Sequence, residues 1–353
     1  MTAESAPRAT GPAEVTNAAA FLHAATVGGH LEMDEHAEAN GGASVRHQLD
    51  PLPAPYPPVV VDFVAALDRL VTGTRSAADE ETLRPLRGKQ MLFVGDSTDG
   101  NLWSRLCHCT RRTASGLAVA EAAVGSERAI AQDVRCFDSA RPGDLSSCTF
   151  PTLNLSLHFA ASEFGVHPFG RIKWHPVDYM PVCPPNALSV CLHKKLHSLR
   201  NSRYSIKQWG QTRSPDLVTV HLNFWLEHSY SFRAVKAERV ASWSDLMRSY
   251  RHNFTVFVRS LREVLPTVGL WATHTSIIGQ GPVPSPAMTE HVNAALREVA
   301  VREHLACADW QLMAHAGWTR RQAVLYDGRH ARLSINSALG NIYLNALAII
   351  PFS

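Results

Sequence analysis

The stretch LFVGDSTDGNLW, from Leu92 to Trp103, contains a buried strand that ends on a small polar turn. Together with the two residues before it, the run QMLFVGD at 90–96 is apolar without alternation, which is typical of a strand covered on both faces of a parallel sheet. Gly95, Asp96 and Ser97 end this run. Reactive groups of parallel sheets lie at the carboxyl ends of the strands. The sequence therefore predicts that this turn belongs to a functional site.

Strands and helices alternate along the chain on either side of that turn. The clearest helix is predicted at 242–265, where apolar residues recur at spacings of three and four. Further helices are expected at 59–71, from Pro286 onward and at 342–349, and further strands at 152–161, 216–225, 268–276 and, as a short strand or turn, 306–313. This order predicts a three-layer α/β/α fold with a mainly parallel central sheet.

The predicted domain organisation is a leader followed by one domain. Residues 1–55 are rich in Ala, Gly, Glu, Pro and His and show no sustained periodicity, so we expect a disordered N-terminal leader. Residues 56–353 are expected to form the α/β/α domain, with a long insertion at about 162–215.

Composition excludes several classes of function. A formal charge of +3 on 353 residues is too small to indicate nucleic acid as the main partner. The sequence contains no apolar run long enough to span a membrane and no recognisable signal peptide, so as written it predicts a cytoplasmic chain. Seven cysteines leave at least one thiol free and do not fix the compartment. The sequence does not indicate an oligomeric state.

Two groups of cysteine and histidine raise the possibility of zinc. Residues 107–109 read Cys-His-Cys, and His193 and His197 stand beside Cys191. The two groups are much farther apart in sequence than the ligands of a compact zinc module. The sequence therefore favours a site without metal.

Ser97 is a candidate nucleophile, because its hydroxyl follows a buried strand on a turn whose backbone N–H groups can face an oxyanion. A serine needs a base, and the base needs an orienting acid. The segment LYDGRHARL places Asp327 three residues before His330, so the carboxylate can reach Nδ1 and leave Nε2 for the serine. Each motif alone is also compatible with an ordinary polar turn.

In this order, FVGDS, DLVTVHLNFW and DxxH resemble the SGNH (GDSL-type) hydrolase superfamily over about residues 88–350. The likeness is greatest to the PC-esterase group, which includes the plant trichome-birefringence-like polysaccharide O-acetyltransferases. The resemblance implies a flavodoxin-like α/β/α fold, acyl transfer through a serine ester, a small-molecule or glycan ester substrate, and no metal or other cofactor. It also implies work in the secretory pathway, where the plant relatives act.

Carried over by position, Ser97 matches the nucleophile, His330 the base and Asp327 its orienting acid. The Ser97 N–H and Asn223 are the implied oxyanion donors. An ungapped match places Asn223 on the motif's glycine, so a strand-end cap is an equally open interpretation. The positions that support the motifs are Gly95, Asp96 (as a turn-stabilising partner), Asn101, Trp103, Cys107 and, nine residues after Asp216, Trp225.

The sequence also departs from the group. Gly100 stands where many members carry arginine, and Ala331 and Arg332 follow the final histidine where the plant enzymes have Cys and Trp. The plant subgroup's substrate is therefore not carried over. The motifs do not separate a hydrolase from an acyltransferase.

Two other functions compete with this one. A catalytically inactive carbohydrate-binding or scaffold protein on the same fold would explain the departures. A haloacid-dehalogenase-type phosphatase would use the acids of VGDSTDG to hold Mg²⁺. That chemistry requires a DxD pair, which the sequence lacks. The Mg²⁺-binding motif also requires a second acid four residues after Asp96, but position 100 is a glycine.

Overall fold

The computed structural model describes residues 12–27, 29–33, 45–49, 61–108, 134–137, 145–161, 214–221, 243–265, 269–277, 286–315 and 333–350. The helices are α1 (Pro12–Val27), α3 (Phe63–Thr72), α4 (Ala77–Leu83), the 3-10 helix η1 (Arg84–Leu86), α5 (Ser97–Cys107), α9 (Trp243–Val264), α10 (Pro286–Arg302), α11 (Trp310–His315) and α12 (Leu333–Ile349). The strands are β1 (Gly29–Met33), β2 (Val45–Leu49), β3 (Gln90–Gly95), β4 (Arg135–Phe137), β5 (Leu145–Phe150), β6 (Leu155–Ala161), β7 (Leu217–Val220), β8 (Leu270–His274) and β9 (Ala306–Ala308).

The central sheet has the order β4-β5-β6-β3-β7-β8-β9. Strands β6, β3, β7, β8 and β9 run parallel, whereas β4 and β5 add an antiparallel edge beside β6. Numbered along the chain, the parallel strands have the order 2-1-3-4-5, which is the doubly wound order of flavodoxin-like folds. The predicted mainly parallel sheet is confirmed, and the motif-bearing strand β3 lies inside it.

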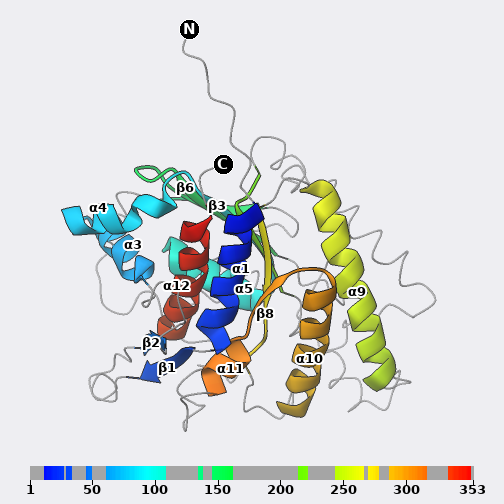
Figure 1. Ribbon diagram of the computed structural model, residues 1–353. Coiled ribbons are helices and arrows are strands. Elements are labelled where there is room, and N and C mark those ends of the chain that lie inside the picture. The colour runs from blue at the N-terminus through cyan, green and yellow to red at the C-terminus, as the bar shows by residue number, and fades with distance from the viewer. Residues whose placement is uncertain are drawn as a thin grey trace, which may run out of the picture.

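Helices cover both faces of this sheet (Figure 1). Met91 and Phe93 of β3 belong to the core cluster that includes residues of α1, α3, α5 and α12. Leu92 and Val94 belong to the other cluster, with residues of α9 and α10. Because successive side chains of a strand point to opposite faces, an uninterrupted apolar strand supplies both clusters. This explains the run 90–96 and confirms the predicted three layers.

Buried polar groups fix β3 and β7 in register at their amino-terminal ends. The Gln90 N–H donates to Asp216 Oδ2 at 2.7 Å, and the Lys89 ammonium lies 4.0 Å from Asp216 Oδ1. At the other end, the His221 N–H donates to the Val94 carbonyl at 2.9 Å. The strands therefore end at the same edge, and His221 lies directly beside the end of β3.

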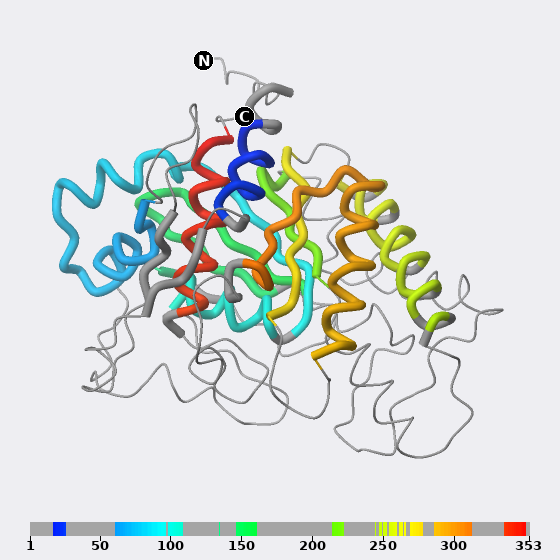
Figure 2. The backbone as a smooth tube through the Cα atoms, turned by 60° about the horizontal axis from the view of Figure 1, so that its bottom comes forward, coloured from blue at the N-terminus to red at the C-terminus, as the bar shows by residue number. Residues whose placement is uncertain are grey.

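The expectation of disorder for residues 1–55 is wrong for part of that range. Helix α1 buries Ala18, Phe21, Leu22 and Ala25 completely, and it contacts α12 and β9. Figures 1 and 2 both show α1 (blue) beside α12 (red). The four residues have the i, i+3, i+4, i+7 spacing of a buried helix face, but the surrounding alanines conceal it. Strands β1 and β2 form a separate antiparallel pair in the same range.

The structure reproduces the other predicted elements, most of them with shorter bounds, as α3, β3, β6, β7, α9, β8, α10 and β9. Helix α12 begins nine residues before the predicted start at 342. The sequence did not predict helices α4, α5 and α11 or strands β4 and β5. Residues 162–213 of the predicted insertion lie outside the described part of the chain. Within the described ranges, no helix has both the length and the apolar composition needed to cross a membrane.

Candidate active site

The turn after β3 is built by Asp96, which caps α5. Asp96 has extended backbone angles, its Oδ1 accepts from the Thr98 N–H at 2.8 Å, and its carbonyl accepts from the Gly100 N–H at 3.0 Å. A capping carboxylate satisfies N–H groups that the helix leaves unpaired and lies favourably at the positive end of the helix dipole. Asp96 thus has the turn-stabilising part that the sequence suggests. Ser97 is the first residue of α5, at the carboxyl edge of the sheet.

Gly95 is required by the close approach of Asp99. A Cβ at position 95 would lie 1.9 Å from Asp99 Oδ2 and 2.4 Å from its Cγ. Only a residue without a side chain leaves this space to the carboxylate. The first glycine of the motif therefore places an acid from the first turn of α5 against the end of β3.

The Asp99 carboxylate lies between two histidines from neighbouring strands. Its Oδ2 is 3.2 Å from Nδ1 of His221, which follows β7. Its Oδ1 is 3.1 Å from Nε2 of His274, the last residue of β8. At most 1% of the surface of each of these three residues is exposed. Three elements are thereby joined at the sheet edge where the Ser97 turn lies.

Further contacts fix the two imidazole rings. The His274 ring stacks on His221 with centroids 4.0 Å apart and on Trp310 with centroids 3.5 Å apart. His221 Nε2 lies 3.1 Å from the hydroxyl of Ser276, and His274 Nδ1 lies 3.3 Å from the Thr275 carbonyl oxygen. The orientation of both rings is therefore set by their second nitrogens as well as by Asp99.

Charges in this cluster depend on burial. Burial alone would raise the pKa of Asp99, but His274 and His221 overcome it and hold that pKa well below the ordinary value. Burial, reinforced by His221, lowers the pKa of His274. Burial also raises the pKa of the Tyr343 hydroxyl. The carboxylate is thus ionised, and the His274 imidazole resists protonation.

The sequence does not predict this cluster. Asp99 is part only of the phosphatase alternative, and His221 and His274 lie within predicted strands. A usable signal was present, because each histidine ends an apolar strand and the carboxyl ends of parallel strands meet at one edge. The number of histidines in the chain concealed that signal.

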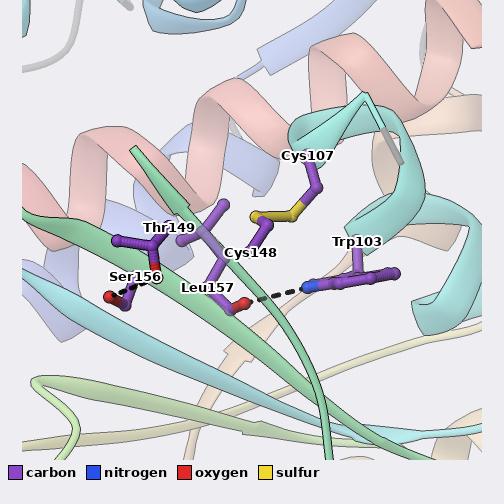
Figure 3. The surroundings of a disulfide bond; sticks show 6 residues. All are labelled: Trp103, Cys107, Cys148, Thr149, Ser156 and Leu157. Carbon is purple, nitrogen blue, oxygen red and sulfur yellow. Dashed lines mark hydrogen bonds between the residues drawn. A yellow bond between two sulfur atoms is a disulfide. The ribbon is translucent and has the colours of Figure 1, made fainter. Parts of the chain in front are cut away.

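Helix α5 continues from the turn into a well-anchored core segment. The Trp103 indole N–H donates to the Leu157 carbonyl at 3.0 Å, and Cys107 forms a disulfide with Cys148 of β5 (Figure 3). Asn101, also expected to support the motif, is half-buried on the same helix. These contacts fix α5 to the sheet, and they thereby fix the position of its first turn, which contains Ser97.

The disulfide removes the zinc interpretation of residues 107–109. A sulfur bonded to Cys148 is not available as a thiolate ligand. His108 instead lies 2.7 Å from Asp68, on the surface of the molecule. The other residues of that hypothesis, including Cys109 and His193, lie outside the described residues.

Most of the predicted catalytic residues also lie outside the described part of the chain. This holds for Asp327, His330, Asn223 and Trp225, and for the side chain of Ser97, whose backbone alone is described. The catalytic triad and the oxyanion donor stay predictions.

No protein-family model matches this sequence. Among solved structures, the chain is similar to Axe2, an acetylxylan esterase from Geobacillus stearothermophilus, with 14% identity and a TM-score of 0.39 over 75% of this chain and 96% of that one. It is similar to LAE5, an α/β hydrolase enzyme from the metagenome of Lake Arreo in Spain, with 15% identity and a TM-score of 0.39 over 75% and 97% of the two chains. It is also similar to a GDSL-like lipase from Parabacteroides merdae, with 11% identity and a TM-score of 0.37 over 74% and 97%.

Proposed function

We propose that this chain is a serine-dependent ester hydrolase or O-acyltransferase of the SGNH type, acting on O-acetyl groups of a carbohydrate or a similar small ester. The observation that carries the proposal is the place of Ser97. It is the first residue of α5, and only Asp96 separates it from β3, a central strand of the mainly parallel sheet. Backbone N–H groups at such a helix start can stabilise a developing oxyanion.

The course of α12 supports bringing Asp327 and His330 to this serine. The Lys89 ammonium, just before β3, donates to the Ile350 carbonyl, and the Tyr343 ring lies 6.3 Å from that of Phe93 within β3. Helix α12 therefore runs opposite to β3, and its first residue, Leu333, lies toward the carboxyl edge of the sheet. His330 precedes Leu333 by only three residues in the sequence, which supports the proposal that the DxxH segment acts together with the Ser97 turn.

The proposed reaction is acyl transfer through a serine ester. Ser97 attacks the acyl carbonyl while His330 accepts its proton, and His330 then returns that proton to the leaving alcohol. Asp327 holds the imidazole tautomer, and the Ser97 N–H with Asn223 binds the oxyanion. The acyl-serine is then attacked by water in a hydrolase or by an acceptor hydroxyl in a transferase. The two activities differ only in this second nucleophile.

Hydrolysis of p-nitrophenyl acetate and of an acetylated oligosaccharide, together with labelling by a fluorophosphonate probe, tests the proposal. We expect Ser97→Ala and His330→Ala each to lose several orders of magnitude in kcat, and the double variant to be scarcely worse, because members of one catalytic unit are not additive. Ser104→Ala, in the same helix, is the matched control. The rate should rise through about pH 6 to 7 as a catalytic histidine loses its proton.

Two results would contradict this function. A folded Ser97→Ala variant with wild-type turnover would exclude the serine mechanism. A wild-type protein that binds the oligosaccharide, hydrolyses neither ester and is not labelled at Ser97 would indicate the inactive carbohydrate-binding alternative. Adding an unacetylated acceptor sugar and analysing the products distinguishes transfer from hydrolysis.

The disulfide bears on the compartment. Structural disulfides persist mainly in oxidising compartments and are rare in the cytosol. The Cys107–Cys148 bond therefore supports a place in the secretory pathway, as the family resemblance implies, over the cytoplasm.

A further inference from the structure

The carboxylate of Asp99 and the imidazoles of His221 and His274 surround one point in the protein interior. One donor atom from each of the three side chains lies within 4.8 Å of the other two. The two separations that join Asp99 to the histidine rings are 3.1 and 3.2 Å. Two atoms bound to a common zinc ion at about 2.1 Å, with an angle near 100° between them, are separated by about 3.2 Å. The separations of Asp99 from both histidines therefore fit ligands of one metal ion.

The outward-facing nitrogens match the surroundings of metal-bound histidines. A histidine that binds a metal through one nitrogen commonly donates its other N–H to an oxygen, which fixes the tautomer. Here His274 Nδ1 faces the carbonyl oxygen of Thr275, and His221 Nε2 faces the hydroxyl of Ser276. The backbone of Ser276 is itself fixed, because its N–H donates to Asn293 Oδ1 and its carbonyl accepts from Asn293 Nδ2.

The hydrogen-bond count at His274 requires a positive charge. Its Nδ1 and Nε2 face a carbonyl oxygen and a carboxylate oxygen, and both of these oxygens only accept. A neutral imidazole has one N–H, so one nitrogen would present a lone pair to an acceptor. The alternative is an imidazolium with no exposed surface, stacked on the ring of His221. A cation between Nε2 and Asp99 allows both of these atoms to bind it while Nδ1–H donates to Thr275.

A second buried carboxylate adds to the negative charge. Asp96 is 1% exposed, its Oδ1 lies 3.9 Å from His221 Nδ1, and its Oδ2 has no hydrogen-bond partner among the described residues. Within the described residues, the ion pairs of Asp96 and Asp99 involve histidines and no lysine or arginine. Buried carboxylates are normally paired or coordinate metals. A divalent cation would balance two of them.

We propose that Asp99, His221 and His274 bind a divalent first-row transition-metal ion, with Asp96 as a second negative group beside it. Two imidazole nitrogens and a carboxylate oxygen are a donor set typical of Zn²⁺. The ion would join the first turn of α5 to the ends of β7 and β8. Its ligand Asp99 lies two residues after Ser97 in the chain. The proposal does not depend on the ester chemistry, and its test uses no substrate.

Metal content of the purified full-length chain, prepared without a histidine tag, is the first measurement. By elemental analysis we expect about one zinc, or another first-row divalent metal, per wild-type chain, and less than about a tenth of that in Asp99→Asn and His274→Gln. His158→Gln is the matched control, because His158 is a buried histidine on β6 that contributes no ligand. It should retain the wild-type content, and circular dichroism should show that each variant is folded.

Titration of chelator-stripped protein with Zn²⁺ is the second measurement, and it decides the question even if the ligand variants do not fold. Stripped wild type should bind one Zn²⁺ with a Kd below about 1 µM. Ser276→Ala, which removes only the oxygen facing His221, should bind about 10- to 100-fold more weakly. A wild-type protein that purifies without metal and binds Zn²⁺ more weakly than that limit overturns the proposal and leaves a hydrogen-bonded Asp-His-His network. Equal metal content in folded Asp99→Asn overturns it as well.

Discussion

The carboxylate of Asp99 occupies the space that a side chain at Gly95 would need, with a Cβ there falling 1.9 Å from Oδ2. From this position Asp99 contacts His221 and His274. Because Gly95 has no side chain, it leaves the space that the Asp99 carboxylate needs to make these contacts.

Replacing Gly95 with alanine should therefore destabilise the protein by about 1–3 kcal/mol, the usual cost of inserting a methyl group into a packed site. Urea unfolding would measure it. The same replacement in an Asp99→Gly background should cost less, because the clashing carboxylate is gone, and a double-mutant cycle isolates that coupling. Equal costs in both backgrounds would show that the close approach does not matter.

Removing the disulfide should destabilise the folded protein by about 4 kcal/mol. This follows from the loss of loop-closure entropy for a separation of 41 residues between Cys107 and Cys148. Chemical denaturation of the Cys107→Ala/Cys148→Ala double variant provides the measurement. Reductant should destabilise the wild type and Cys307→Ala, which lacks the free thiol of Cys307, but not the double variant. Stability that is insensitive to reductant in all three proteins would contradict the prediction.

His158 should make the protein less stable at mildly acidic pH. Burial lowers the pKa of His158 from 6.5 to about 4. Below pH 6.5 the unfolded chain binds a proton that the folded protein does not, so stability falls between about pH 6.5 and pH 4, by up to about 3 kcal/mol.

Urea unfolding of wild type and His158→Gln at about pH 7.5 and about pH 4.5 tests this linkage. The variant should lose less stability between the two values, and the difference isolates His158 from the other histidines. Asp68 does not interfere in this range, because Arg105 and His108 overcome the effect of its burial and lower its pKa to about 2. An identical pH dependence in both proteins would exclude a neutral, buried His158.

Asn223→Ala should lower kcat by about 10²-fold and change KM little if Asn223 is an oxyanion donor, because the contact forms only in the transition state. Steady-state kinetics with p-nitrophenyl acetate would measure both constants. Asn17→Ala, at an exposed position of α1, serves as the control and should leave both unchanged. If Asn223→Ala lowers stability and leaves kcat as it is, the residue is a strand-end cap.

The sequence predicted the elements whose pattern is local. Strand β3 is apolar from Met91 to Gly95 because both of its faces are buried, and α9 repeats its apolar residues at helical spacing. Helix α1 was missed because Phe21 and Leu22 stand among alanines that obscure the buried stripe. The Asp99, His221 and His274 cluster could not be read from spacing, since its members are far apart in sequence and meet only through the order of β3, β7 and β8 in the sheet. The sequence could place Ser97 at the turn after β3, where α5 begins, because that position depends on a single strand; its catalytic role stays a prediction.

The packing of α1 on α12 has a consequence for how the protein matures. Helix α1 spans residues 12–27 and α12 spans residues 333–349, so all of the sequence between them must be synthesised before one can meet the other. Until then, the fully buried Phe21 and Leu22 remain exposed to solvent. Closing so large a loop is entropically costly and slow. A growing polypeptide with such an unsatisfied apolar stripe is a natural client for chaperones, and its aggregation during expression should depend on how quickly translation reaches the last helix.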